Sequence, residues 1–215
     1  MNKQYYESKS VNYGISHTRR RKILELIDRN GLRVLDVACA SGYLGERIKS
    51  AGNYVAGLEI SEAAAQKARQ VLDAVFVGDI QDDWPAELRN GKYDLVIMAE
   101  ILDHIFDPIA VVRRARETLR NSGSIIITVS NFLIWKNRIK FLFGKFAYTD
   151  QGAFDFGHIR WFTWRYLKTV LSEGGFKITR QNHIIYPGKL TRLLSWWPSL
   201  FASQFIVKAN KIQGK

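Results

Sequence analysis

The segment "VLDVACASGYLGERI" combines an apolar run, small residues and a carboxylate in an order that suits a nucleoside ligand. The run predicts a buried strand ending near Asp36, and a helix begins near Tyr43. Small residues in the intervening turn let a ligand approach the backbone closely, and the helix N-terminus offers free N–H groups. A second predicted strand ends at Glu59, at the spacing of about 20 residues where a carboxylate accepts both hydroxyls of a ribose.

A nicotinamide dinucleotide site would share these features, but its fingerprint also needs the glycines of Gly-x-Gly-x-x-Gly. The corresponding residues here are Ala38, Ala40 and Tyr43, and tyrosine is far too large for the third position. An ordinary turn between a strand and a helix remains an alternative for this loop taken alone.

A second chemically capable group follows the fourth predicted strand. It contains Glu100, Asp103 and His104, at the sheet edge where ligands of parallel α/β folds bind. His104 is the first candidate for a general base, the distant His158 is the second, and Glu100 is assigned to the same catalytic group. In one alternative, His104 only braces its loop. In the other, these side chains hold a divalent metal.

The elements that must position these residues alternate along the chain. Helices are predicted over about 19–29, 41–53, 61–72, 107–123 and 163–176, and strands over about 33–40, 54–60, 74–80, 93–100, 124–130, 177–187 and 203–211. Ser61, Asp107 and Thr163 stand where helices begin, as N-cap residues do. Such alternation predicts an α/β fold with a parallel sheet covered on both faces.

Together these motifs resemble those of class I S-adenosylmethionine-dependent methyltransferases. The loop matches the family pattern Asp-x-Gly-x-Gly-x-Gly through Asp36, Ala38, Ala40 and Gly42, with alanine at two glycine positions. "VFVGDI" is similar to the segment whose acidic residue, here Asp79, binds the adenine amino group beside Ile80. "YDLVIMAEILDHIFDP" and "HIRWFTWRYLKTVLSEGGF" also look like family motifs. The resemblance spans about residues 20–185 and points to the bacterial group related to MetW and ubiquinone O-methyltransferases.

This resemblance implies one Rossmann-like methyltransferase domain over residues 1–215, with a mostly parallel seven-stranded sheet and helices on both faces. Residues 1–20 would form an arm or lid, and 131–162 an insertion near the active site. The implied cofactor is S-adenosyl-L-methionine, with S-adenosyl-L-homocysteine as product, and Ile60 and Ala99 join Glu59 in its site. A divalent metal is an alternative that we do not expect.

The implied reaction is O-methylation of a small molecule, a sugar or glycan, or a lipid-linked intermediate. A nucleic-acid methyltransferase is the runner-up among enzymes, although no RNA-binding motif supports it. The alternative outside enzymes is a binding protein that keeps the fold with a degenerate loop.

Positive charge is concentrated in the second part of the chain. From Asn131 onward there are 14 Lys and Arg against 3 Asp and Glu, whereas the preceding residues have 18 against 17. The segments "FLIWKNRIKFLFGKF" and "KLTRLLSWWPSLF" mix basic, aromatic and aliphatic residues, as interfacial helices do. One interpretation is peripheral contact with an anionic membrane. A solvated basic face and a site for single-stranded nucleic acid are the alternatives.

The single cysteine excludes a disulfide within the chain. We identify no secretory signal, and no apolar run approaches the roughly 18 residues of a membrane-spanning helix. The sequence therefore predicts a cytoplasmic protein, with peripheral membrane attachment as a further interpretation.

Overall fold

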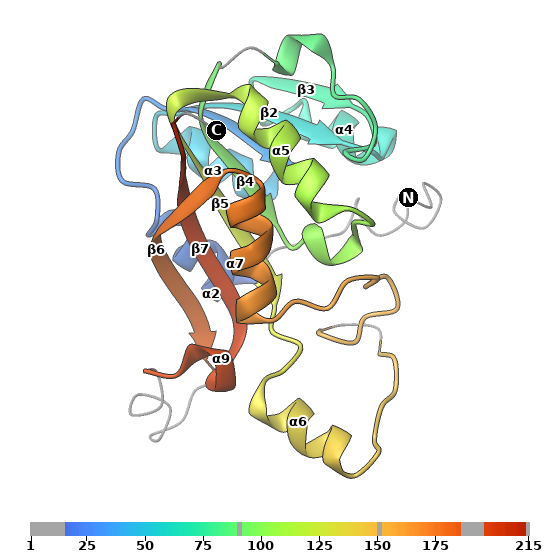
Figure 1. Ribbon diagram of the computed structural model, residues 1–215. Coiled ribbons are helices and arrows are strands. Elements are labelled where there is room, and N and C mark those ends of the chain that lie inside the picture. Colours follow the sequence, from blue (N-terminus) through green and yellow to red (C-terminus); the bar gives the residue numbers. More distant parts are fainter. Residues whose placement is uncertain (1–15, 90–91, 150–151, 186–195, 214–215) are drawn as a thin grey trace.

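A single sheet of seven strands organises the part of the chain that the structure describes. The computed structural model describes residues 16–89, 92–149, 152–185 and 196–213. The strand order is β3-β2-β1-β4-β5-β7-β6, and β7 runs antiparallel to both of its neighbours (Figure 1). The strands are β1 (Arg33–Val37), β2 (Tyr54–Glu59), β3 (Ala74–Val77), β4 (Tyr93–Ala99), β5 (Leu119–Ser130), β6 (Phe176–Ile185) and β7 (Ala202–Lys211). The predicted seven-stranded, mostly parallel sheet is confirmed.

Helices cover both faces of this sheet, as predicted. The helices α2 (His17–Leu24), α3 (Tyr43–Ser50) and α4 (Glu62–Ala68) pack on one face. The helices α5 (Pro108–Thr118) and α7 (Trp164–Glu173) pack on the other face (Figure 1). Alternate residues of a strand enter the two cores, because Val34 belongs to the first and Leu35 to the second. Two short 3₁₀ turns, η1 (Ala86–Leu88) and η2 (Leu102–His104), complete this region.

Three helix starts follow from local capping. The side chains of Ser61, Asp107 and Thr163 accept hydrogen bonds from the backbone N–H groups of Ala64, Ala110 and Tyr166. Each bond satisfies a donor that the first helical turn leaves without a partner in the helix. The predicted starts of α4, α5 and α7 are therefore confirmed.

Three predicted helices end clearly earlier than expected, and one of these, expected over 61–72, ends at Ala68. The helix expected over 19–29 ends at Leu24, and turns lead to Gly31 with its φ of +73°. The helix expected over 107–123 ends at Thr118, and residues 119–123 belong to β5. Leu119 pairs with Tyr93, whereas the next pair is Ser124 with Leu95, so the residues between form a bulge. This pairing is tertiary and leaves no local signal in the sequence.

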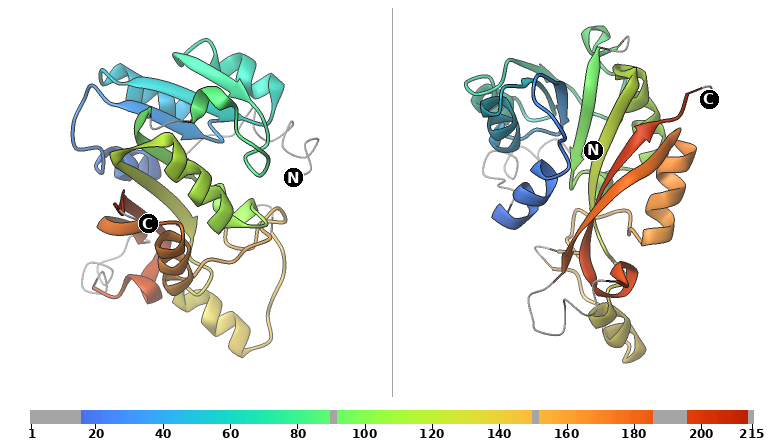
Figure 2. Two further views of the ribbon diagram at one scale, coloured as in Figure 1. Left: turned by 45° about the horizontal axis from the view of Figure 1, so that its top comes forward. Right: turned by 90° about the vertical axis from the view of Figure 1, so that its left-hand side faces the viewer.

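A small helix stands apart from the sheet. Helix α6 (Trp135–Leu142) lies beyond the end of β5, near α9 (Pro198–Phe201) (Figures 1 and 2). The Asn131 side chain links the two regions by donating to the carbonyls of Ser199 and Ala202. The predicted arm over 1–20 lies outside the described residues up to residue 15, and residues 17–20 belong to α2. None of the described helices is long and apolar enough to cross a membrane.

Candidate functional site

The loop between β1 and α3 has a left-handed backbone at each position where the methyltransferase pattern has glycine. The φ angles are +59° at Ala38, +48° at Ala40 and +82° at Gly42. Alanine seldom adopts this region, because its Cβ crowds the backbone at a cost of roughly 1–2 kcal/mol. The alanines therefore keep the backbone course that glycines would allow freely.

Glu59, at the end of β2, holds this loop through hydrogen bonds. Its carboxylate oxygens accept from the backbone N–H of Ala40 at 2.8 Å and from that of Ser61 at 2.9 Å. The residue is only 2% exposed. The loop and the end of β2 thus form one hydrogen-bonded unit.

Asp36, near the end of β1, is equally buried. Burial raises the pKa of Asp36 to about 7, and the negative charge of Glu59 contributes in the same direction. Its Oδ2 has no hydrogen-bond partner among the described residues. Two buried acids so close together favour a cation nearby, since each carboxylate is otherwise destabilised by the other.

The remaining predicted cofactor residues gather at the same sheet edge. Ile60 follows β2, Asp79 and Ile80 follow β3, and Ala99 ends β4. The neighbouring strands β3, β2, β1 and β4 are parallel, so their carboxyl ends meet at one edge. The Asp79 carboxylate accepts from the N–H of Gln81, and Ile80 is buried. A ligand spanning the adenine, ribose and loop positions would therefore cross these strand ends.

These residues fit a positively charged nucleoside. The loop offers closely approachable backbone, Glu59 offers a carboxylate for hydroxyl groups, and Asp36 is a buried acid whose Oδ2 has no hydrogen-bond partner among the described residues. S-adenosylmethionine carries a ribose, whose hydroxyl groups match the Glu59 carboxylate, and a sulfonium cation, which suits a site that contains buried acids. The donor set therefore agrees with the cofactor that the sequence motifs imply.

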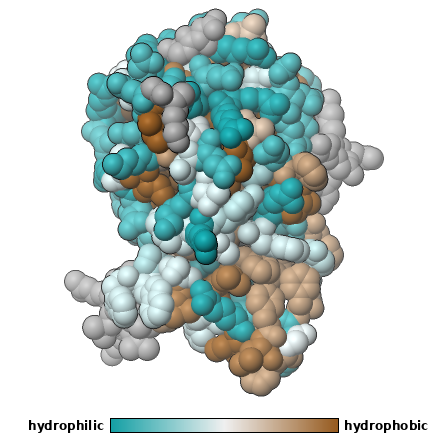
Figure 3. All heavy atoms as spheres, viewed as in Figure 1, coloured by the Kyte–Doolittle hydropathy of each residue, from teal (hydrophilic) through white to brown (hydrophobic). Residues whose placement is uncertain are grey.

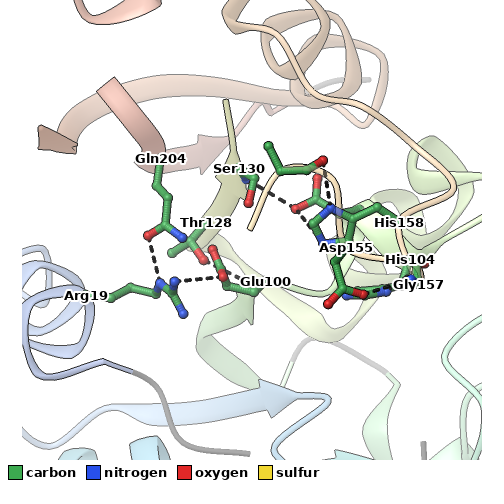
Figure 4. Close-up of polar contacts among 11 residues, drawn as sticks. Arg19, Glu100, His104, Thr128, Ser130, Asp155, Gly157, His158 and Gln204 are labelled. Atoms are coloured by element: carbon green, nitrogen blue, oxygen red, sulfur yellow. Dashed lines mark hydrogen bonds and ion pairs between the residues drawn. The ribbon is translucent and has the colours of Figure 1, made fainter. Parts of the chain in front are cut away.

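Glu100 stands directly after β4 in a strained conformation. Its φ is +58°, and its N–H donates to both the carbonyl and the hydroxyl of Thr128. Its carboxylate forms an ion pair of 2.9 Å with Arg19, which also donates to Gln204 (Figure 4). Burial raises the pKa of Glu100, whereas the charge of Arg19 opposes that rise. The Glu100 carboxylate therefore faces Arg19 of α2, which in turn contacts Gln204 of β7.

The two candidate bases lie together on the other side of this region. The ring centroids of His104 and His158 are 4.7 Å apart, in an edge-on arrangement. His158 Nε2 lies 3.9 Å from Oδ2 of Asp103, which also accepts from the Ser130 N–H. Burial, followed by the charge of Glu100, raises the pKa of the Asp103 carboxyl well above its usual range. Figure 4 shows the histidines grouped with Asp155 and Gly157, while Glu100 turns toward Arg19.

The last residues of segment 131–162 contact this histidine cluster. The N–H groups of Ile159 and Arg160 both donate to the Asp103 carbonyl at 3.0 Å, and the Gly157 carbonyl contacts His104. Arg19, Asp155 and Gly157 did not appear among the sequence candidates. A local signal existed for two of them, since Asp-Phe-Gly has the form of an Asx turn. Among the described residues, no three His, Cys, Asp or Glu side chains converge as metal ligands do.

A family model described as a methyltransferase domain matches residues 14–181. The chain belongs to this methyltransferase family. The ubiquinone biosynthesis O-methyltransferase of Aromatoleum aromaticum is 33% identical to this methyltransferase over 116 residues, which is 50% of each chain. The methyltransferase thus spans about half the length of the curated relatives it matches. The predicted relationship to ubiquinone O-methyltransferases is confirmed.

Solved structures agree on the fold. A methyltransferase from Archaeoglobus fulgidus, named as dependent on S-adenosylmethionine, superposes with a TM-score of 0.68 at 18% identity, covering 90% of this chain and 92% of its own. A magnesium protoporphyrin IX methyltransferase from Synechocystis, with S-adenosylhomocysteine bound, gives 0.63 at 17% identity and covers 97% of both chains. At such low identity these similarities establish the Rossmann-like methyltransferase fold and nothing finer.

Proposed function

We propose that this chain binds S-adenosyl-L-methionine across the ends of β1 to β4 and methylates a hydroxyl oxygen of a small molecule. The observation that carries the proposal is the left-handed backbone of Ala38 and Ala40, tied to the Glu59 carboxylate. A chain that no longer bound the cofactor would have little reason to retain this strained loop. The alternative of a binding protein with a degenerate loop is therefore less well supported.

Methyl transfer needs a positioned nucleophile more than it needs acid–base chemistry. When bound, the cofactor supplies a methyl group on positively charged sulfur, which leaves as a neutral thioether. The acceptor hydroxyl loses its proton as the new O–C bond forms. The residue proposed to take up that proton is His104, which has His158 beside it. S-adenosyl-L-homocysteine would be the second product.

The methyl acceptor is proposed at the level of class. The relatives' names support a small hydroxylated molecule, and glycans and lipid-linked intermediates stay within the proposal. We treat residues 1–215 as one methyltransferase domain, with 1–20 as an arm and 131–162 as an insertion near the active site. The contacts of Ile159 and Arg160 with Asp103 support that placement of the insertion.

Calorimetry of the purified chain tests the cofactor proposal. Binding of S-adenosylmethionine and S-adenosylhomocysteine at micromolar concentrations is expected, with NAD as a nucleotide control that should not bind. Transfer of a labelled methyl group to a panel of catechols, sugars and lipid-linked sugars would then define the acceptor. An absence of binding to either cofactor form at millimolar concentration would refute the enzyme proposal.

We further propose that the helix α6 and its flanks, residues 133–149, form a basic aromatic protrusion that touches an anionic membrane. Residues 131–149 contain no Asp or Glu, while Lys136, Arg138, Lys140 and Lys145 are exposed. Leu142 is 80% exposed and Phe143 is 69% exposed. Figure 3 shows a hydrophobic surface with hydrophilic residues beside it over α6. Such a pairing of exposed apolar and basic side chains suits the boundary between headgroups and acyl chains.

Removing charge from this protrusion is expected to weaken binding to anionic vesicles. Each basic residue near such a surface contributes about 1 kcal/mol, so Lys136→Ala/Lys140→Ala/Lys145→Ala should reduce vesicle binding by on the order of 10²-fold at low salt. The control Lys67→Ala/Lys168→Ala/Lys177→Ala removes as many exposed charges elsewhere and should keep binding. Sedimentation with vesicles of varied anionic lipid content measures both.

A parallel assay with single-stranded RNA separates the alternatives for this surface. Retention by RNA and not by vesicles would replace the membrane proposal with a nucleic-acid substrate. Binding to neither would leave a solvated basic face.

Residues 189–195 of the second basic aromatic segment lie outside the described residues, whereas Trp196 and Trp197 are exposed beside each other.

A further inference from the structure

A backbone carbonyl of the turn formed by residues 152–158 contacts His104, the first candidate base. The Nδ1 atom of His104 lies 2.9 Å from the carbonyl oxygen of Gly157. A carbonyl oxygen only accepts hydrogen bonds, so Nδ1 must carry the proton in this contact. In a neutral imidazole the lone pair then resides on Nε2, which becomes the basic atom.

We infer that Asp155 and Gly157 are positioning residues that fix the protonated nitrogen and the orientation of His104. Both residues belong to a turn that is distant from His104 in the sequence, and the conformation of this turn places a carbonyl against the His104 ring. The inference rests on the proposed function only for its effect on turnover.

Gly157 is required at its position by the His104 ring. A Cβ atom built on Gly157 would lie 2.9 Å from Nδ1 and 3.0 Å from Cε1 of His104. Real Cβ atoms are essentially never that close, so any side chain here would push the imidazole away from the carbonyl. Glycine therefore permits the contact that decides which nitrogen of the His104 ring carries the proton.

Asp155 shapes the turn from within. Its Oδ1 accepts from the N–H of Gly157 at 2.8 Å, and its carbonyl accepts from the N–H of His158 at 2.9 Å. The residue is 8% exposed. An aspartate that bonds the backbone two residues ahead forms an Asx turn. Because of this turn, the Gly157 carbonyl points toward His104, and His158 lies edge-on to the same ring.

The same turn also contacts the second histidine. Nδ1 of His158 lies 3.4 Å from the Ala153 carbonyl, and its Nε2 faces Asp103. Both histidines therefore present Nδ1 to backbone carbonyls from residues 153–157. A single local structure thereby contacts both candidate bases at Nδ1.

Nuclear magnetic resonance of the cofactor-free chain tests this assignment directly. Long-range ¹H–¹⁵N correlations distinguish the two imidazole tautomers, and a His104→Gln variant identifies the signals of that ring. The wild type should show His104 protonated at Nδ1. Asp155→Asn should match it, because the amide oxygen accepts the same bond. Asp155→Ala and Gly157→Ala should show a mixture of tautomers.

Turnover provides the second measurement. Asp155→Ala should lower kcat about 10-fold or more while the Kd for S-adenosylmethionine stays unchanged, and Asp155→Asn should restore kcat. Protonation at Nε2 in the wild type would overturn the inference, as would an unchanged tautomer in both Asp155→Ala and Gly157→Ala. Because the spectra need no substrate, failure to find a methyl acceptor would count against the proposed function alone. The Gly157 variant keeps the test decisive if Asp155→Ala does not fold.

Discussion

Replacing His104 with alanine is expected to lower the rate of methyl transfer by roughly 10²-fold or more, the typical contribution of a general base. Affinity for S-adenosylmethionine should be unchanged, because the His104 ring contacts the Gly157 carbonyl, whereas Glu59 binds the β1–α3 loop. Calorimetry and single-turnover kinetics on the same preparation would measure the two effects separately.

His17→Ala is the matched control, since His17 is an exposed histidine at the start of α2. It should retain full activity. Full activity of His104→Ala would remove the base role and leave the interpretation that His104 braces its loop. Loss of activity with a chelator, followed by recovery with magnesium, would instead favour the metal alternative built on Glu100, Asp103, His104 and His158.

Replacing Glu59 with alanine should weaken cofactor binding by on the order of 2–3 kcal/mol, about 30- to 150-fold in Kd. The variant would lose the proposed acceptor for the ribose hydroxyls, and it would also leave the N–H groups of Ala40 and Ser61 without this acceptor. Calorimetric titration with S-adenosylhomocysteine measures the affinity, and thermal unfolding of the same variant reports damage to the loop.

Glu62→Ala controls for loss of an acidic residue in the same region. Glu62 lies three residues further along the chain, and its ion pair with Arg69 is exposed. Surface pairs of this kind contribute little, so its Kd should equal that of the wild type. Unchanged affinity in Glu59→Ala would exclude Glu59 from the cofactor site. An intermediate Kd in Glu59→Gln would indicate that one acceptor oxygen still serves.

The sequence predicted features that depend on near neighbours. The caps at Ser61, Asp107 and Thr163 rely on bonds three residues long, and all three occur. The gathering of Glu59 with the loop also followed, because parallel strands bring their carboxyl ends together. Motif order then identified the family, although alanines replaced two glycines of its main motif.

Features made by distant segments were not predictable in this way. Arg19 and Gln204 meet across 185 positions, and nothing near either residue indicates the other. The start of β5 was missed because it depends on pairing with Tyr93. The contact between Gly157 and His104 joins segments 53 residues apart. Polar partners of the candidate site thus emerged only once the sheet had brought these segments together.

The left-handed alanines also affect the entropy of cofactor binding. A glycine loop without ligand samples many conformations, and ordering that loop costs free energy when the ligand arrives. Alanine at residues 38 and 40 has fewer accessible conformations than glycine but disfavours the left-handed one, so the Glu59 carboxylate must hold the conformation that the structure adopts. The loop thus loses fewer conformations on binding, so part of the ordering cost is met during folding, and the binding entropy should be less unfavourable than with glycines.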